Sequence, residues 1–516
     1  MQYGQDRQRI TLECSVRERR KERRVWIGKK SVIINNNLER EQNIMTAKSN
    51  SKKLSAIVLG MAGLVVLGAA KAAVPDATIY GPIAADQPAA DTRNSIYSAS
   101  AIPLTEQGYV EEEYFIEGTA NRYSMEGLTD GSVADSGHPY RTRLIVRRPQ
   151  NPARFNGIVI VEWINVTGGP DKDIDWWQSG PHLVRNGYAF IGVSAQQMGI
   201  DTMIEWSPER YGELDTTHDG MVEGDALSFD IFAAVGKAVN RVGETTPAGS
   251  VDILPGLEAE QILATGHSQS ASRLAAYINN LHMLDPVFDG FMVHGGGGRI
   301  RDDGEAKIFK IMAETDMSRR AAEPQPDTDS FRQWEVAGSS HVDEIFELEY
   351  AKVRNLREGL STDNVFVRDS QCNLPPYSRV PFRHVMDAAF EHLVSWVRDD
   401  VPPPTASPLQ VKQMMPQVEF ARDEQGNILG GIRLAAHAVP TAKNTGMNGG
   451  TTNRFCFLYG SHEPFDQATL DSLYESHADY VTQVRAVVEA NLEAGYILPY
   501  AAEQTIRAAE ASSIGR

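Results

Sequence analysis

The sequence predicts an α/β fold built on a mostly parallel, doubly wound β-sheet flanked by helices. Short apolar runs, typical of strands buried on both faces, alternate along the chain with segments whose apolar residues follow a helical period. Each apolar run also leads into a loop of small or polar residues, as the strands of such a sheet do. The composition of the 516 residues, 41% hydrophobic and 23% charged, is ordinary for a globular protein.

The strands and helices of this sheet are expected in a regular order. Residues 141–148 set apolar side chains against Arg143 and Arg147, which indicates a half-exposed strand. Strands buried on both faces are expected at 157–161, 188–193, 261–264, 291–293, 308–312 and 333–336, and helices at 178–186, 228–239 and 270–282. Ligands bind beyond the carboxyl ends of parallel strands, so the chemistry is expected in the following loops: residues 165–169, 194–197, 266–270, 314–316 and 337–341.

The C-terminal part begins at a proline-rich stretch, residues 402–408. Beyond it lies a mixed segment with helical character from 466 to 509. We expect a sheet core at about 140–400 and an extension at about 401–516 that packs on it. The extension could cover the mouth of a site or pack beneath it.

The charge is strongly asymmetric along the chain. The net charge is −18, yet residues 1–72 carry 15 Lys and Arg against 6 Asp and Glu, which leaves the other 444 residues at −27. An acidic working protein argues against nucleic acid or anionic membrane as a partner.

The basic head indicates export. Lysines 48, 52 and 53 precede an apolar run at 54–70 and an Ala-Lys-Ala site at 70–72, as in a secretory signal peptide. We therefore expect a signal peptide at 45–72, a mature domain at 73–516, and a periplasmic or secreted bacterial protein. A membrane anchor is the alternative, but a spanning helix needs about 20 apolar residues and this run is shorter. Residues 1–44 are interpreted as a mis-assigned leader upstream of a start at Met45, or else as a long n-region.

A nucleophilic serine is predicted at Ser268. The pattern Gly-His-Ser-Gln-Ser at residues 266–270 is weak alone, but a strand precedes it and a helix follows, as a nucleophile elbow requires. A serine that only caps the helix is the alternative reading. The backbone N–H of Gln269 is the expected first donor of an oxyanion hole.

A serine hydroxyl needs a general base that a carboxylate orients. His341 is the expected base, because it follows a late strand after Ser268. The acid is expected just past the intervening strand, at Asp316 or, alternatively, Glu314.

The loop after the first buried strand supplies the other expected site residues. A second oxyanion donor is assigned to the Asn165–Val166 region, where Gly168 and Gly169 permit close backbone approach. Trp163 and His267 are candidates for substrate binding, and core packing is the alternative for the tryptophan. No zinc-type spacing is present, and no metal or cofactor is expected.

These landmarks resemble the α/β-hydrolase superfamily, and more narrowly a bacterial family labelled "alpha/beta hydrolase domain". The resemblance rests on residues 161–169, 266–270, 314–316, 334–341, 430–434 and 439–441. Because it spans most of the mature chain, it disfavours residues 402–408 as a boundary between independent domains. It implies serine-hydrolase chemistry without a cofactor, and it fixes no substrate.

The sequence therefore predicts a serine hydrolase that cleaves small-molecule carboxylic esters. Amide, lactone or peptide substrates for the same triad are the alternatives, and a non-catalytic binding protein on this fold is a further one. After loss of the leader, Cys372 and Cys456 remain in an oxidising compartment and are either a disulfide or two free buried cysteines. No stable membrane insertion of the mature chain is expected, and the oligomeric state is left open.

Overall fold

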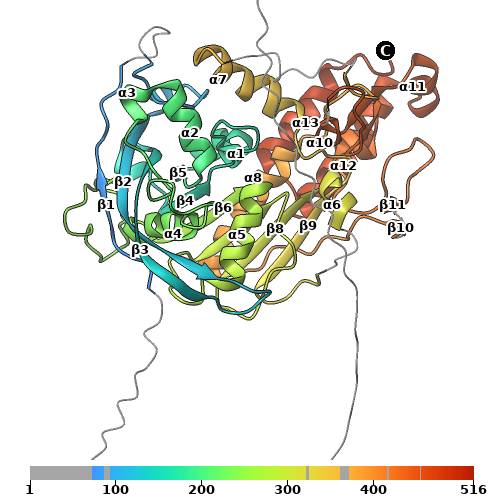
Figure 1. Ribbon diagram of the computed structural model, residues 1–516. Coiled ribbons are helices and arrows are strands. Elements are labelled where there is room, and N and C mark those ends of the chain that lie inside the picture. Colours follow the sequence, from blue (N-terminus) through green and yellow to red (C-terminus); the bar gives the residue numbers. More distant parts are fainter. Residues whose placement is uncertain (1–72, 87–92, 321–324, 361–370, 415–417, 454) are drawn as a thin grey trace, which may run out of the picture. The chain divides into compact units, whose positions relative to one another are not determined.

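The computed structural model describes residues 73–86, 93–320, 325–360, 371–414, 418–453 and 455–516 (Figure 1). The leader expected at 1–44 and the signal peptide expected at 45–72 lie outside these residues. All of the described residues belong to a single compact unit. None of the helices in the described part combines the length and apolar character needed to cross a membrane.

A nine-stranded sheet, counted over the described residues, forms the centre of this unit, in the order β1-β2-β3-β5-β4-β6-β7-β8-β9. The first three strands are antiparallel, and β3 is antiparallel to β5. The strands from β5 to β9 are parallel, which confirms the predicted fold class. Their bounds are β1 (Ala77–Tyr80), β2 (Tyr109–Ser124), β3 (Ser132–Pro149), β4 (Ile158–Trp163), β5 (Ala189–Val193), β6 (Gln261–His267), β7 (Gly290–His294), β8 (Lys307–Ala313) and β9 (Phe331–Val336).

Helices cover both faces of the sheet (Figure 1). Alternate residues of β4 pack in two separate clusters: Ile158 and Ile160 in one, and Val159 and Val161 in the other. The first cluster includes residues of α1 and α8, and the second includes residues of α4 and α5. The longer helices are α1 (Ile174–Arg185), α2 (Gln197–Trp206), α4 (Ser228–Ala238), α5 (Gln269–Asn280), α6 (Glu314–Arg320), α7 (Lys352–Arg357), α8 (Phe382–Asp399), α11 (Gln467–Leu473), α12 (His477–Glu493) and α13 (Pro499–Ala511).

The remaining elements are short. They comprise α-helices α3 (Pro208–Tyr211), α9 (Ala435–Ala438) and α10 (Cys456–Tyr459), the 3₁₀ helices η1 (Thr105–Gln107) and η2 (Pro152–Arg154), and the π-helix η3 (Phe346–Ala351). The short strands are β10 (Val411–Gln413), β11 (Glu419–Phe420), β12 (Ala442–Thr445) and β13 (Ser461–Pro464). The last four strands pair as β10–β11 and β12–β13.

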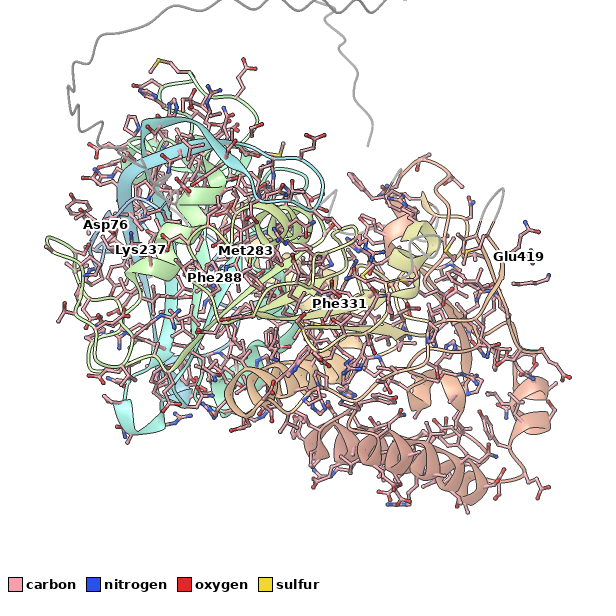
Figure 2. All side chains as sticks on the ribbon, turned by 90° about the horizontal axis from the view of Figure 1, so that it is seen from below. Asp76, Lys237, Met283, Phe288, Phe331 and Glu419 are labelled. Carbon is pink, nitrogen blue, oxygen red and sulfur yellow. A yellow bond between two sulfur atoms is a disulfide. The ribbon has the colours of Figure 1, made fainter. Side chains whose placement is uncertain are left out.

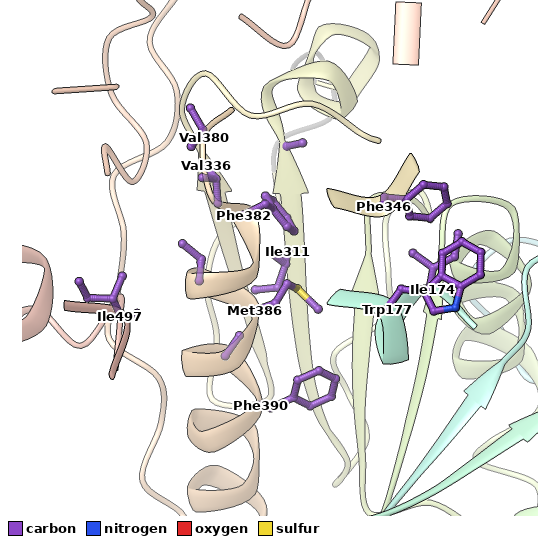
Figure 3. Packing of buried hydrophobic residues seen from close by; sticks show 14 of the residues in the cluster. Ile174, Trp177, Ile311, Val336, Phe346, Val380, Phe382, Met386, Phe390 and Ile497 are labelled. Carbon is purple, nitrogen blue, oxygen red and sulfur yellow. The ribbon is translucent and has the colours of Figure 1, made fainter. Parts of the chain in front are cut away.

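Helix α8 is the main contributor to the first cluster. Figure 3 shows Phe382, Met386 and Phe390 of α8 in the cluster with Ile311 of β8. Phe390 is fully buried, and burying a side chain of this size removes much apolar surface from water. The C-terminal extension joins the same cluster, because the ring of Tyr496 lies 5.3 Å from the ring of Trp334. The extension therefore packs on the sheet core, as predicted.

The second cluster packs the first described residues, including Val74 and Ile79, with residues of α4. Lys237 of α4 pairs with Asp76 at 2.8 Å, and Phe288 lies in the same cluster (Figure 2).

The β2–β3 hairpin corrects the expectation of one half-exposed strand. Arg143 and Arg147 are fully buried, and they pair with Glu113 and Glu111 of β2, each at 2.6 Å. A charged strand face that looks solvated in sequence is thus an interior layer of ion pairs, which burial permits only when the charges are matched.

The register of the parallel strands places the site. His267 of β6 pairs with His294 of β7, and Ala313 of β8 pairs with Val336 of β9. The carboxyl ends of these strands therefore meet at one edge of the sheet, where the loops expected to carry the chemistry begin.

Candidate functional site

Ser268 lies at the turn between β6 and α5, with φ 61° and ψ −112°. A non-glycine residue rarely adopts a positive φ, so close packing must enforce this conformation. A Cβ on Gly266 would lie 3.2 Å from the carbonyl carbon of Ser270, and one on Gly296 would lie 2.4 Å from the Ser268 carbonyl oxygen. A side chain at residue 296 would therefore clash with the Ser268 backbone, and one at residue 266 would press on the Ser270 backbone.

Ser268, His341 and Asp316 form one hydrogen-bonded row. The Ser268 Oγ is 2.8 Å from His341 Nε2, and His341 Nδ1 is 2.6 Å from Asp316 Oδ1. The other carboxylate oxygen of Asp316 accepts the Ala313 N–H at 2.8 Å. Burial alone would raise the pKa of Asp316, but the charge and the hydrogen bond of His341 lower it below its usual value.

Glu314, the alternative acid, faces a different partner. Its carboxylate accepts from Arg422 at 2.7 Å and from the Gly338 N–H at 3.1 Å. Burial raises the pKa of Glu314, and the Arg422 charge opposes this shift. Both acids lie on α6, which begins directly at the end of β8, and only Asp316 is directed at His341.

The two predicted oxyanion loops lie beside the serine. Gln269 is the first residue of α5, so its backbone N–H has no acceptor within the helix. The Asn165 N–H donates to the Lys172 carbonyl at 3.0 Å, which removes it as an oxyanion donor. The Val166 N–H has no acceptor among the described residues and is the remaining donor of the predicted pair.

Asn165 has a positioning role instead. Its Nδ2 donates to the His267 carbonyl at 2.8 Å, and its Oδ1 accepts the Thr167 N–H at 2.8 Å. The side chain thus fastens the loop after β4 to the last residue of β6.

Trp163 does not line the site, and its prediction as a substrate-binding residue is wrong. It is fully buried on the α4 face of the sheet, where its ring stacks on Phe232 at 4.6 Å and meets Phe229 at 5.6 Å. The side chain of the last residue of β4 faces this layer because side chains of a strand alternate between the two faces.

His267 borders the larger of two hollows that meet at Ser268, yet its side chain is nearly fully buried. Its ring lies 4.4 Å from that of His341 and 4.3 Å from that of His294. Burial, reinforced by the two neighbouring imidazoles, lowers its pKa well below the usual value, so His267 is neutral.

A second acid–histidine pair lies behind the row and was not anticipated from the sequence. His294 Nδ1 is 2.7 Å from Asp175 Oδ1, and both side chains are buried. Asp175 stands in the first turn of α1, and its other oxygen accepts from the Thr265 hydroxyl. This pair holds the ends of β6 and β7 against α1.

Two hollows meet at Ser268 and His341. The larger has a volume of about 610 Å³ and continues past Phe346, Arg354 and Leu360. The smaller, about 460 Å³, extends past Gln269 and other residues on the α6 side. A cavity of this size accommodates a small organic ligand.

A disulfide braces the wall of the larger hollow. Cys372 and Cys456 are bonded, with Cα atoms 5.5 Å apart and a sequence separation of 84. Their neighbours Gln371 and Phe455 line the hollow. Within the described part of the chain, no group of three or more His, Cys, Asp or Glu side chains is placed to hold a metal ion.

Comparison with known proteins gives one family and a set of distant structural neighbours. A family model described as "Alpha/beta hydrolase domain" matches residues 81–507. No curated protein matches the chain.

The structural neighbours include a putative dienelactone hydrolase from Klebsiella pneumoniae (14% identity, 55% of this chain and 98% of that one, TM-score 0.27). An α/β serine hydrolase without a lid from Xanthomonas campestris has 12% identity, covers 46% and 93%, and has a TM-score of 0.25. A glucuronoyl esterase from Solibacter usitatus has 11% identity, covers 48% and 82%, and has a TM-score of 0.24. Likeness at this level carries no argument about substrate. The family match and the nine-stranded sheet do support one conclusion: this chain belongs to the alpha/beta hydrolase domain family and has the α/β-hydrolase fold.

Proposed function

We propose that this hydrolase is a serine esterase, which cleaves carboxylic esters through an acyl-enzyme. The observation that supports this most is the hydrogen-bonded row from Ser268 through His341 to Asp316, placed where two hollows meet. Nucleophile, base and orienting acid are in hydrogen-bond reach of one another, which is the geometry that acyl transfer needs.

In the acylation step, His341 Nε2 takes the Ser268 proton while the Oγ attacks the ester carbonyl carbon. The carbonyl oxygen gains a negative charge, which the N–H groups of Gln269 and Val166 would stabilise. The Gln269 N–H also lies at the start of α5, where the helix dipole favours negative charge. The C–O bond then breaks, and His341 gives its proton to the departing alcohol.

In the deacylation step, water enters and His341 takes one of its protons. The resulting hydroxide attacks the acyl carbon, the Ser268 Oγ leaves, and the proton returns to it from His341. Asp316 stays ionised throughout and stabilises the imidazolium, a role that its lowered pKa supports.

The test is hydrolysis of p-nitrophenyl acyl esters of graded chain length by the wild type and by Ser268→Ala. Matched p-nitroanilides in the same assay separate ester from amide chemistry. We expect rapid ester hydrolysis, a loss of about 10³-fold or more in kcat for Ser268→Ala, and little anilide hydrolysis. Absence of nitrophenol release by the wild type, or equal release by Ser268→Ala, would refute the proposal.

We further propose that the working protein is exported after removal of residues 45–72. The Cys372–Cys456 bond supports this, because structural disulfides persist in oxidising compartments. N-terminal sequencing of protein recovered outside the cytoplasm is expected to begin near Ala73. An intact leader on that protein would contradict the proposal.

A further inference from the structure

The charged residues that line the larger hollow, counted over the described part of the chain, are cations, although the protein as a whole is acidic. The chain has a net charge of −18, yet the described residues that line this hollow include Lys172 and Arg354 and no Asp or Glu. The smaller hollow adds Arg319, and its one carboxylate among the described residues, Asp316, is already hydrogen-bonded to His341. Among the described residues, the cations Lys172, Arg354 and Arg319 therefore line the two hollows that meet at Ser268.

Arg354 is the central feature of the larger hollow. It is 4% exposed, and its Nε and Nη2 donate to Asn355 Oδ1 at 3.0 and 2.8 Å. Its Nη1 donates to the main-chain carbonyl of Asp171 at 3.2 Å, and its guanidinium lies 5.3 Å from the centre of the Trp177 ring. All these acceptors are uncharged.

The carboxylates near Arg354 are engaged by other groups. Asp171 accepts from the Ser194 hydroxyl at 2.5 Å and lies 3.5 Å from Arg143. Glu358 accepts from the Ser98 N–H and pairs with Arg357 at 3.0 Å. No Asp or Glu oxygen of the described chain forms an ion pair with Arg354 within 4 Å, and Glu358 is its longer-range electrostatic partner: burial raises the pKa of Glu358, and the charges of Arg357 and then Arg354 oppose this shift. Buried charges in proteins are normally paired, because an unpaired one costs much free energy.

Lys172 places a second cation on the loop that follows β4. Its Nζ donates to the main-chain carbonyls of Thr167 and, at 3.5 Å, Pro170. The loop also carries Val166, the proposed oxyanion donor. Lys172 lines the same hollow as Ser268, and the walls of this hollow include the apolar side chains of Ile174, Phe346 and Leu360.

We propose that the natural ester carries a carboxylate, which Arg354 binds with the assistance of Lys172. This inference rests on the proposed esterase function and names its substrate class. A guanidinium presents its N–H groups as a planar fork that matches a carboxylate, and it binds most strongly where water is excluded. The apolar walls then hold the carbon skeleton that joins the carboxylate to the ester group.

The test uses two pairs of esters that differ in charge and little in shape. The first pair is p-nitrophenyl hydrogen glutarate and the corresponding terminal amide, which place the charge on the acyl side. The second is 4-carboxyphenyl acetate and 4-carbamoylphenyl acetate, which place it on the alcohol side. The quantity measured is the preference, the ratio of kcat/KM for the anionic ester to that for its neutral partner.

We expect the wild type to prefer the anionic member of one pair by at least about tenfold. Arg354→Gln should abolish most of that preference, a loss of about tenfold, and Lys172→Gln should reduce it less. Arg354→Lys, which keeps the charge and loses the fork, should retain part of it. Lys412→Gln, an exposed cation on β10, is the matched control and should leave the preference unchanged.

Ser268-dependent hydrolysis without an anionic preference in either pair would overturn this inference and leave the esterase function standing. A preference that persists in both Arg354→Gln and Lys172→Gln would overturn it as well. Because Arg354 is buried, Arg354→Gln could fail to fold, and its activity on the neutral ester shows whether it has folded. Lys172 is only half-buried, so the preference of Lys172→Gln provides a second test that is less exposed to this risk. Hydrolysis that does not depend on Ser268 would instead refute the esterase function itself, and the inference with it.

Discussion

Ser268 has a backbone conformation with φ 61°, and two glycines close the space around it. The strain has a chemical use, because it turns the hydroxyl away from the α5 axis and towards His341. His341 is held in turn from its backbone, where its N–H donates to the Thr315 hydroxyl at 3.2 Å. Nucleophile and base are therefore both fixed by their own local backbone, before any substrate binds.

Asp316 binds His341 and Glu314 binds Arg422, so substitutions of the two acids should have different effects on activity and stability. Asp316→Asn removes the charge that stabilises the imidazolium and should lower kcat by about 10⁴-fold with little loss of stability. Glu314→Gln leaves Arg422 with an uncompensated charge and should lower the melting temperature more than it lowers kcat. The measurements are ester hydrolysis and thermal unfolding of both variants. A folded Glu314→Gln that loses as much activity as Asp316→Asn would show that the acid has been assigned wrongly.

The order of residues along the chain was enough to predict the nucleophile and the base. It was not enough to choose the acid, because two carboxylates lie on the same helical turn. Ser268 directly follows β6 and His341 comes after β9, and the order of serine, acid and histidine along the strands suffices to select both residues. Asp316 and Glu314 are two residues apart on one helical turn, so only their partners distinguish them. The placement of Trp163 depends on which face of β4 it occupies, and a strand buried on both faces gives no signal for that.

At the scale of elements, the antiparallel hairpin shows why polar sequences mislead. Its arginines at 143 and 147 lie in the interior because Glu113 and Glu111 face them across the strand pair. Pairing across strands 30 or more residues apart cannot be deduced from the period of either strand alone. The parallel strands, whose apolar runs are continuous, were predicted to within a few residues.

Asp230 of α4 connects this helix to the β2–β3 hairpin, and its carboxylate is expected to make stability depend on pH. Asp230 accepts from the Tyr123 hydroxyl at 2.6 Å and from the Asn121 N–H at 2.7 Å. Burial raises its pKa to about 6, above the value of about 3.9 in an unfolded chain. Between these values the folded state binds more protons, so the free energy of unfolding should fall by up to about 3 kcal/mol as the pH rises through that window.

Urea unfolding from about pH 4 to about pH 7 measures this dependence. Asp230→Asn, which cannot titrate, should flatten the profile in that range. Asp399→Asn, at an exposed position of α8, should leave the profile as in the wild type. An unaltered slope in Asp230→Asn would assign the pH dependence to another group.

Helix α8 is expected to contribute strongly to stability through its apolar face. Phe390→Ala removes a fully buried ring from the first cluster and should cost about 3–5 kcal/mol in the free energy of unfolding. Arg398→Ala on the exposed side of the same helix loses an ion pair with Glu260 and a hydrogen bond to the Asn156 carbonyl, both at the surface, and should cost less than about 1 kcal/mol. Chemical denaturation of the two variants tests this difference, and similar losses would contradict the packing described for α8.

At the scale of the whole molecule, the C-terminal extension is part of the hydrolase and not an appended module. Residues of α12 and α13 share one apolar cluster with the sheet, and the segment near Phe455 lines the larger hollow. The packing on the core was predicted from the sequence, and one part of the extension also lines the site. Which part does so could not be predicted, because the contacts join segments far apart in the chain.

The disulfide between Cys372 and Cys456 is expected to affect both the stability of the fold and the shape of the larger hollow. It closes a long loop, and in the chain-entropy account a loop of this length stabilises the folded state by about 4 kcal/mol. The double variant Cys372→Ser/Cys456→Ser should lose stability of this order, and KM should rise because the adjacent residues line the hollow. Denaturation and steady-state kinetics of the double variant provide the check. Wild-type values for both would show that the bond does not brace the site.

The proposed mechanism requires Ser268 to be the reacting group, and covalent labelling with a fluorophosphonate tests this directly. Such a reagent phosphonylates an activated serine and leaves ordinary serines unmodified, because only a hydroxyl with a base in place attacks it at neutral pH. We expect one equivalent of label, located on Ser268 by peptide mass spectrometry, slower labelling of Asp316→Asn, and none of Ser268→Ala. Esterase activity in a protein that takes no label, or that takes it at another residue, would contradict the account.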